Sequence, residues 1–277
     1  EGGRGLDCFF NDYFNAKVFK EKFGTKKAKV ITAIAMFYDL EEPDAFVEDV
    51  KEILDGKGIF VIQMNYLPLM LLNHAFDNIS HEHLEYYSLM TLEVLLAKHD
   101  LEVFDVELND INGGSLRVWI KHKSCELFPV STSVASIRYL EKAWRLDDQH
   151  TYDEFQEDIY WMKMETMRFL EDELAKGKKI YLYGASTRGL VTLQFYGINK
   201  KHVVKAAERN PAKYGKTIVG TGIPIASEEE CRKEEPDYFF VLPWQFLDEF
   251  MKRESDFLEK GGKFIVSLPY FRVIGKS

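Results

Sequence analysis

The sequence predicts an α/β protein built from two α/β units joined by a long helix. Short apolar runs rich in β-branched residues alternate with segments whose apolar residues recur at helical spacing, which is typical of βαβ units in a largely parallel sheet. Between the two sets of strands, residues 151–176 keep one helical pattern until Gly177 ends it. The chain of 277 residues is long enough for two hydrophobic cores.

The first unit is predicted from a strand, helix, glycine turn and strand, followed by a helix and a pair of strands. Its strands are expected at 29–36, 59–64, 101–108 and 115–122, and its helices at 44–54 and 89–98. The last two strands flank a short polar connection that contains Gly113 and Gly114. Such a connection favours an antiparallel hairpin, so we expect a mixed sheet.

The second unit continues the alternation of strands and helices. Its strands are expected at 179–183, 203–207, 237–242 and 264–268, and its helices at 190–196 and 244–259. A segment rich in Ser and Thr at 129–136 reads as a boundary. We therefore divide the chain into a first domain at 1–125, a helical connector at 126–176 and a carboxyl-terminal α/β domain at 177–277.

The composition narrows the class of protein. A net charge of -9 argues against general binding of nucleic acid. No apolar run approaches the ~20 residues of a membrane helix, and residues 1–5 lack the start of a signal peptide. Cys8, Cys125 and Cys231 are too few and too far apart for a disulfide framework or a zinc site. We expect a cytoplasmic protein without a bound metal, and its oligomeric state stays open.

The candidate catalytic residues are His81, Glu82 and His83. Two imidazoles and a carboxylate in a loop are suited to proton transfer, because a histidine near a carboxylate is a common general base. A zincin would need a histidine at position 85, where this chain has Glu85. The alternative is a polar loop whose histidines bind backbone carbonyls.

Two glycine-containing segments are candidate ligand sites. Residues 112–117 read Asn-Gly-Gly-Ser-Leu-Arg, where the glycines allow close approach of a ligand and the arginine can bind its oxygens; a plain hairpin turn is the alternative. Residues 184–189 form a strand-to-helix turn whose amides could bind phosphate. Because Glu208 follows about twenty residues later, where a dinucleotide-binding protein has its ribose ligand, an NAD(P)-dependent oxidoreductase is a competing interpretation. A tight turn without a ligand is the third.

Taken together, these segments resemble the sugar C-methyltransferases, a family of class I S-adenosylmethionine-dependent enzymes. The resemblance covers nearly the whole chain, and the His-Glu-His and Gly-Gly-Ser-Leu-Arg motifs are specific in combination. The matching segments are residues 76–88, 112–118, 184–189, 209–215, 220–225, 242–244 and 261–265.

The resemblance implies a partial class I methyltransferase sheet and a second Rossmann-like domain. It also implies removal of a proton next to the carbonyl of a nucleotide-linked keto-sugar, in deoxysugar or surface-polysaccharide synthesis, and methyl transfer from S-adenosylmethionine to the enolate. His83 is the expected base, oriented by Glu82 and His81. The other expected contacts are Asn112, Ser115 and Arg117 for the sugar, Ser186, Thr187 and Arg188 for its phosphates, and Phe10 and Ala33 for the cofactor.

The sequence departs from the family at several positions. The family has Tyr where Ser80 stands, His where Asn112 stands, and Lys and Asn where Arg188 and Leu190 stand. Its cysteine-rich zinc domain and its glycine-rich cofactor loop should precede Leu6, and the chain does not contain them. We expect either a fragment of a longer protein or a shortened relative, so a non-catalytic protein that binds nucleotide sugars is a further alternative.

Overall fold

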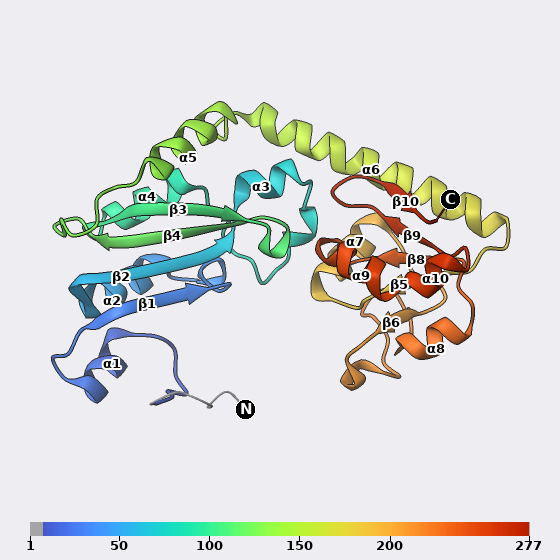
Figure 1. The fold of residues 1–277 in the computed structure, drawn as a ribbon, viewed down its shortest axis with the longest axis horizontal. Coiled ribbons are helices and arrows are strands. Elements are labelled where there is room, and N and C mark those ends of the chain that lie inside the picture. The colour runs from blue at the N-terminus through green and yellow to red at the C-terminus, as the bar shows by residue number, and fades with distance from the viewer. Residues whose placement is uncertain (1–7, 277) are drawn as a thin grey trace. The chain divides into compact units, whose positions relative to one another are not determined.

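The computed structural model describes residues 8–276, and the chain forms two compact units. The first unit comprises the residues up to Met64 together with Tyr87–Asn109 and Leu116–Glu141. The second unit comprises Asn65–Tyr86, Asp110–Ser115 and the chain from Lys142 onward. Figure 1 shows the α/β character of each unit, as the sequence predicts.

The first unit contains a four-stranded sheet in the order β1-β2-β4-β3. Its elements are α1 (Ala16–Phe23), β1 (Ala28–Ile34), η1 (Phe37–Asp39), α2 (Pro43–Ile53), β2 (Leu54–Asn65), α4 (Leu89–Ala97), β3 (Leu101–Asn109), β4 (Ser115–His122) and α5 (Thr132–Ala143). β1 and β2 pair in parallel, which confirms the predicted βαβ unit. β3 and β4 are neighbours joined by residues 110–114, a connection too short for a parallel crossover, so the predicted hairpin is confirmed (Figure 1).

The second unit contains a six-stranded sheet in the order β10-β9-β8-β5-β6-β7. Its elements are α3 (Leu67–Leu72), η2 (Phe76–Asn78), η3 (Ile111–Gly113), α6 (Gln149–Ala175), β5 (Ile180–Tyr183), α7 (Thr187–Tyr196), β6 (Ala206–Glu208), η4 (Pro211–Lys213), β7 (Ile225–Ser227), α8 (Glu228–Lys233), β8 (Tyr238–Val241), η5 (Trp244–Phe246), α9 (Leu247–Arg253), α10 (Ser255–Glu259), β9 (Lys263–Val266) and β10 (Arg272–Ile274). β5 to β9 are parallel and β10 is antiparallel.

The order of this sheet fixes where a ligand would bind. Counted from β5, the strands lie in the order 3-2-1-4-5-6, which is that of the dinucleotide-binding Rossmann fold. Alternate residues of β5 face opposite cores: Ile180 and Leu182 face one, Tyr181 and Tyr183 the other. The order in which the strands are added reverses between β5 and β8, and in such sheets ligands bind at the carboxyl ends of the strands flanking this point.

The unit boundaries differ from the predicted domains 1–125, 126–176 and 177–277. Residues 65–86 and 110–115 belong to the second unit, and so does α6. The physical reason is burial: the ring of Phe76 is 3% exposed and packs on Phe195 and Tyr196 of α7, at centroid distances of 5.0 and 5.6 Å. Local sequence patterns do not reveal such a long-range contact.

Two further elements differ from the sequence prediction. The segment 129–136 is not a plain boundary, because α5 begins at Thr132. The helix predicted over 244–259 breaks at Glu254, whose φ is -101°. The carboxylate of Glu254 turns inward to accept hydrogen bonds from Tyr183 and Arg232, and the residue is 2% exposed. A buried carboxylate that must reach these partners therefore interrupts the apolar periodicity.

None of the helices in the described part of the chain has the length and apolar character that a membrane crossing requires.

We predict that Phe76→Ala lowers the free energy of unfolding of the second unit by about 3–5 kcal/mol, because a fully packed aromatic side chain is removed. Urea unfolding followed by tryptophan fluorescence measures this in a Trp119→Phe background, which leaves Trp144, Trp161 and Trp244, all in the second unit. Phe246→Ala is the matched control, because Phe246 is 48% exposed, and it should cost less than about 1 kcal/mol. Equal effects of the two substitutions would contradict the assignment of residues 65–86 to this core.

Candidate functional site

A buried carboxylate, Asp77, lies at the centre of the candidate site. It is 1% exposed and belongs to η2. The guanidinium of Arg188 binds it through two bonds, Nε to Oδ2 at 2.9 Å and one terminal nitrogen to Oδ1 at 2.8 Å. The indole Nε1 of Trp244 donates to Oδ2 at 3.2 Å. A buried carboxylate needs such donors, and a two-pronged arginine contact is the strongest kind.

The same guanidinium also holds the glycine-containing loop at η3. Its third described bond, from Nη1, reaches the backbone oxygen of Asn112 at 2.8 Å. Asn112 is in the left-handed region, with φ 57°. Asn73 donates to the oxygen of Gly113 at 2.8 Å, and a Cβ at Gly113 would lie 2.7 Å from the ring of Trp244. Glycine is therefore required at 113, where the backbone packs against the indole.

His83 is half-buried and oriented by backbone. Its Nδ1 lies 2.7 Å from the carbonyl oxygen of Asn78, the last residue of η2. Because a carbonyl only accepts, the neutral ring donates from Nδ1 and has its basic lone pair on Nε2. His81 and Glu82 are exposed in a turn. Asn78 is thus one orienting partner of His83, and the orienting roles expected of Glu82 and His81 stay predictions.

Two of the predicted sugar contacts have internal roles. Ser115 is 1% exposed and donates its hydroxyl to the oxygen of Ile111 at 2.7 Å. The prediction that Ser115 faces a substrate is wrong, because the hydroxyl closes its own turn. Arg117 belongs to the first unit, where its Nε donates to Gln63 at 2.8 Å and its guanidinium lies 6.0 Å from the ring centroid of Trp119.

A cavity of ≈ 380 Å³ lies at the carboxyl ends of β5, β6, β7 and β8. It is at the position where a Rossmann sheet binds its ligand. Three cationic side chains and three carboxylates contribute to its wall, with Ser186 at the start of α7. The charged residues are Arg209, Lys213, Arg253, Glu208, Glu228 and Glu249.

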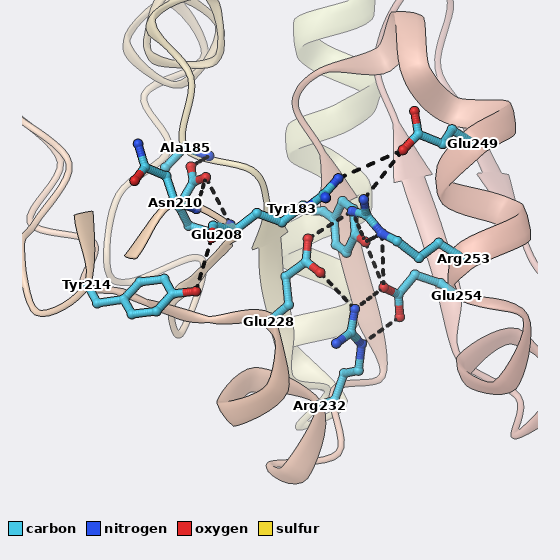
Figure 2. Close-up of polar contacts among 11 residues, drawn as sticks. Tyr183, Ala185, Glu208, Asn210, Tyr214, Glu228, Arg232, Glu249, Arg253 and Glu254 are labelled. Atoms are coloured by element: carbon cyan, nitrogen blue, oxygen red, sulfur yellow. Dashed lines mark hydrogen bonds and ion pairs between the residues drawn. The ribbon is translucent and has the colours of Figure 1, made fainter. Parts of the chain in front are cut away.

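Glu208 lies on one side of this cavity, and Figure 2 shows the polar contacts around it. Its Oε2 accepts from the amide of Ala185 at 3.1 Å and from Lys213 at 3.2 Å, and its Oε1 accepts from the amides of Arg209 and Asn210, both at 2.9 Å. Burial alone would raise the pKa of Glu208, but these hydrogen bonds outweigh burial and hold it below the ordinary value.

The opposite side of the cavity is built from a buried network around Tyr183 (Figure 2). The phenol donates to Glu254 at 2.6 Å and accepts from Arg253 Nε at 3.0 Å. Arg253 also binds Glu228 at 2.8 Å, and Arg232 binds Glu254 at 2.9 Å. Burial, and then the bond to Glu254, raise the pKa of Tyr183. These contacts join α8 and the end of α9 to β5.

The amino-terminal turn of α7 contains the three predicted phosphate contacts. Ser186 caps the helix by accepting from the amide of Gly189 at 3.1 Å, and Thr187 is exposed. The sequence predicts Arg188 near substrate phosphates, but its guanidinium is bound to Asp77 and Asn112. Arg188 thus binds the buried carboxylate of Asp77, where the sequence predicts a substrate phosphate.

Two comparisons with known proteins indicate the same family. Residues 110–269 match the family model of the C-methyltransferase C-terminal domain. The chain is also 33% identical over 237 residues to the C-methyltransferase NovU of Streptomyces niveus. The chain belongs to the C-methyltransferase family. The match includes 83% of this chain but 56% of NovU, so the chain spans little more than half of that relative's length.

Solved structures show only partial likeness to this family member. A methyltransferase of Clostridium acetobutylicum, described as S-adenosylmethionine-dependent, is 13% identical and has a TM-score of 0.27, over 35% of this chain and 59% of that one. A putative methyltransferase of Haloferax volcanii bound to its Trm112 activator is 13% identical with a TM-score of 0.30, over 35% and 55%. Likenesses of this size say nothing about the site.

The two predicted cofactor contacts do not form a cofactor site by themselves. Ala33 is 2% exposed within β1, so its side chain cannot touch a ligand, and that prediction is wrong. Phe10 is 38% exposed, and its ring packs edge-to-face on Phe23 at 6.2 Å. A site for S-adenosylmethionine therefore needs contacts beyond these two residues. No group of three or more His, Cys, Asp or Glu side chains among residues 8–276 is arranged to hold a metal ion.

Asp77, Asn78 and Trp244 are the site residues to which sequence reasoning gives no role. All three lie in matching motif segments, but their functions depend on partners far away in the chain. Asp77 and Arg188 are 111 residues apart, and Asp77 and Trp244 are 167 apart. The one local signal was an aspartate between Phe76 and Asn78 in an apolar setting, which indicates a buried carboxylate in need of a cation.

We predict that Glu208→Gln reduces the acid sensitivity of the second unit. Because folding lowers the pKa of Glu208, its contribution to stability is present above the unfolded value near 4.5 and is lost as the pH falls through the folded value. Urea unfolding at pH 7 and pH 4 measures this: the variant should be less stable at pH 7 and lose less stability on acidification. Glu249→Gln, at a side chain that is 61% exposed, is the matched control. A variant that is as acid-sensitive as the wild type would refute the assignment.

Proposed function

We propose that this protein acts in C-methylation of a nucleotide-linked keto-sugar, with His83 as the base and S-adenosylmethionine as the methyl donor. One observation carries the proposal: the bond between His83 Nδ1 and the oxygen of Asn78, which presents Nε2 as the basic atom in a member of the C-methyltransferase family. A neutral imidazole with this tautomer is suited to accept a proton from carbon through Nε2.

The proposed proton transfer follows from this geometry. Nε2 takes the proton from the carbon next to the sugar carbonyl, the C–H electron pair enters the enolate, and the ring becomes an imidazolium. The carbonyl of Asn78 stays hydrogen-bonded to Nδ1 and so stabilises the charged ring. S-adenosylmethionine would supply an electrophilic methyl group to the enolate carbon. The orienting roles of His81 and Glu82, and the sugar contacts of Asn112 and Arg117, remain part of the proposal.

The nucleotide part of the substrate is proposed to bind at the carboxyl ends of the second sheet. The ≈ 380 Å³ cavity, with Ser186 at the start of α7 and the cations Arg209 and Lys213, supports this placement. Thr187 is exposed next to Ser186 and can add a donor. Arg188 is proposed as a phosphate contact only if a ligand displaces Asp77.

One alternative has a specific observation in its favour. Because Phe10 and Ala33 do not make a cofactor site, a protein that binds nucleotide sugars without catalysis is the second candidate. The oxidoreductase alternative is disfavoured, because both oxygens of Glu208 accept internal hydrogen bonds where a dinucleotide ribose would need them.

Calorimetry on the full chain separates these functions. We expect binding of a nucleotide-diphosphate-linked keto-sugar and of S-adenosylmethionine. Binding of the sugar nucleotide alone would establish the non-catalytic alternative and refute methylation by this chain. Binding of NAD(P) in place of both would establish the oxidoreductase.

We predict that the protein catalyses exchange of the proton next to the sugar carbonyl with D₂O, even without a methyl donor. His83→Gln should slow this exchange by about 10²–10⁴-fold, as expected for loss of a general base. Proton NMR of the keto-sugar follows the exchange, and calorimetry should show little change in nucleotide-sugar affinity. His150→Gln, at an exposed histidine of α6, is the control. Unchanged exchange in the His83 variant would exclude His83 as the base.

A further inference from the structure

The guanidinium of Arg188 connects η2 and the loop at η3 to the start of α7, which follows β5 of the six-stranded sheet. Arg188, at the start of α7, binds Asp77 of η2 through two bonds and the oxygen of Asn112 through a third. The side chain of Arg188 is 17% exposed and that of Asp77 is 1% exposed. The pair is thus largely removed from water, where an arginine–carboxylate contact is strong and directional.

The backbone oxygen of Asn78, the residue after Asp77, orients the imidazole of His83. The backbone oxygen of Asn78 accepts from the amide of Ser80 at 2.9 Å, from His83 Nδ1 at 2.7 Å and from the phenol of Tyr86 at 3.4 Å. Asn78 is itself 2% exposed, and its side chain accepts from Asn65 at 3.1 Å. This carbonyl therefore binds three residues of the loop over 79–86. It also determines which ring nitrogen of neutral His83 carries the proton.

We propose that the Asp77–Arg188 ion pair is the positioning device for His83, which rests on the proposed function of His83 as the base. The pair fixes η2, η2 fixes the carbonyl of Asn78, and that carbonyl keeps the proton of the neutral ring on Nδ1. Arg188 is then a positioning residue rather than a phosphate ligand. Because Arg188 also holds Asn112, the same contact keeps the loop at η3 next to η2.

The device makes a specific demand on residue 188. A lysine keeps the charge but not the two-pronged contact, and it cannot bind two carboxylate oxygens and a carbonyl in one plane. A methionine of similar length removes the cation and leaves Asp77 with the indole of Trp244 among its described donors. Arg188→Met should therefore disturb the orientation of His83 more than Arg188→Lys does.

The test is two-bond ¹H–¹⁵N NMR of the histidine rings at pH 8 on the full chain, with His83→Gln to assign the signals. In the wild type we expect His83 to show a protonated Nδ1 and an unprotonated Nε2. Arg188→Met and Asp77→Asn should shift both nitrogens towards the average of the two tautomers, and Arg188→Lys should lie between. The exchange rate of the sugar proton should fall more than tenfold in Arg188→Met, while the KM for the keto-sugar nucleotide changes less than threefold.

Arg138→Met is the matched control, because it removes an arginine that binds Glu93 through two nitrogens in the first unit. It should leave the His83 spectrum and the exchange rate unchanged. If Arg188→Met does not fold, Arg188→Lys and Asp77→Asn decide the question. A wild-type tautomer signature in the folded variants would overturn the proposal.

The spectra do not require activity. If the wild type catalyses no exchange, the proposed function fails, and the tautomer shift still decides the positioning role.

Discussion

The structure of the second unit depends on the need to neutralise Asp77. Moving a carboxylate out of water costs several kcal/mol, and only a close cation with well-directed hydrogen bonds offsets this cost. Arg188 and Trp244 provide both, and they come from α7 and η5, which follow the neighbouring strands β5 and β8. Satisfying one carboxylate therefore fixes η2 against the sheet, although η2 precedes this sheet in the chain by about a hundred residues.

A second internal carboxylate acts in the same way at the next strand. Glu208 accepts from the amide of Ala185, in the turn where a dinucleotide-binding protein holds its ligand. Asp77 and Glu208 together engage donors at the start of α7 that a Rossmann protein would use for phosphate and ribose. The second unit thus has the topology of a nucleotide-binding domain. Its internal carboxylates, however, accept hydrogen bonds from donors that a nucleotide-binding protein would direct to its ligand.

The sequence predicts most of the regular elements, because their apolar periodicity is a local property. The strands of both sheets other than β7 and β10 follow from it, as do the hairpin at 101–122 and the helices α2, α4 and α6; β7 and β10, of three residues each, are not predicted. What could not be predicted depends on distant residues. Glu254 interrupts a helical pattern to reach Tyr183, and residues 65–86 join the second unit through Phe76 and Asp77. The sequence identifies Arg188 as a candidate ligand contact because it lies in a strand-to-helix turn. Its partner Asp77, however, is 111 residues away in the chain.

The choice of a backbone carbonyl as the partner of His83 has a consequence for how the site can be changed. A side-chain partner such as Glu82 could be removed by one substitution at its own position. The oxygen of Asn78 cannot, because every residue at position 78 has one. The tautomer of His83 therefore depends on where the backbone of η2 lies, and the ion pair of the neighbouring Asp77 holds this backbone. The position of the proton on the His83 ring thus depends on Asp77 and Arg188, which have no described hydrogen bond to the imidazole.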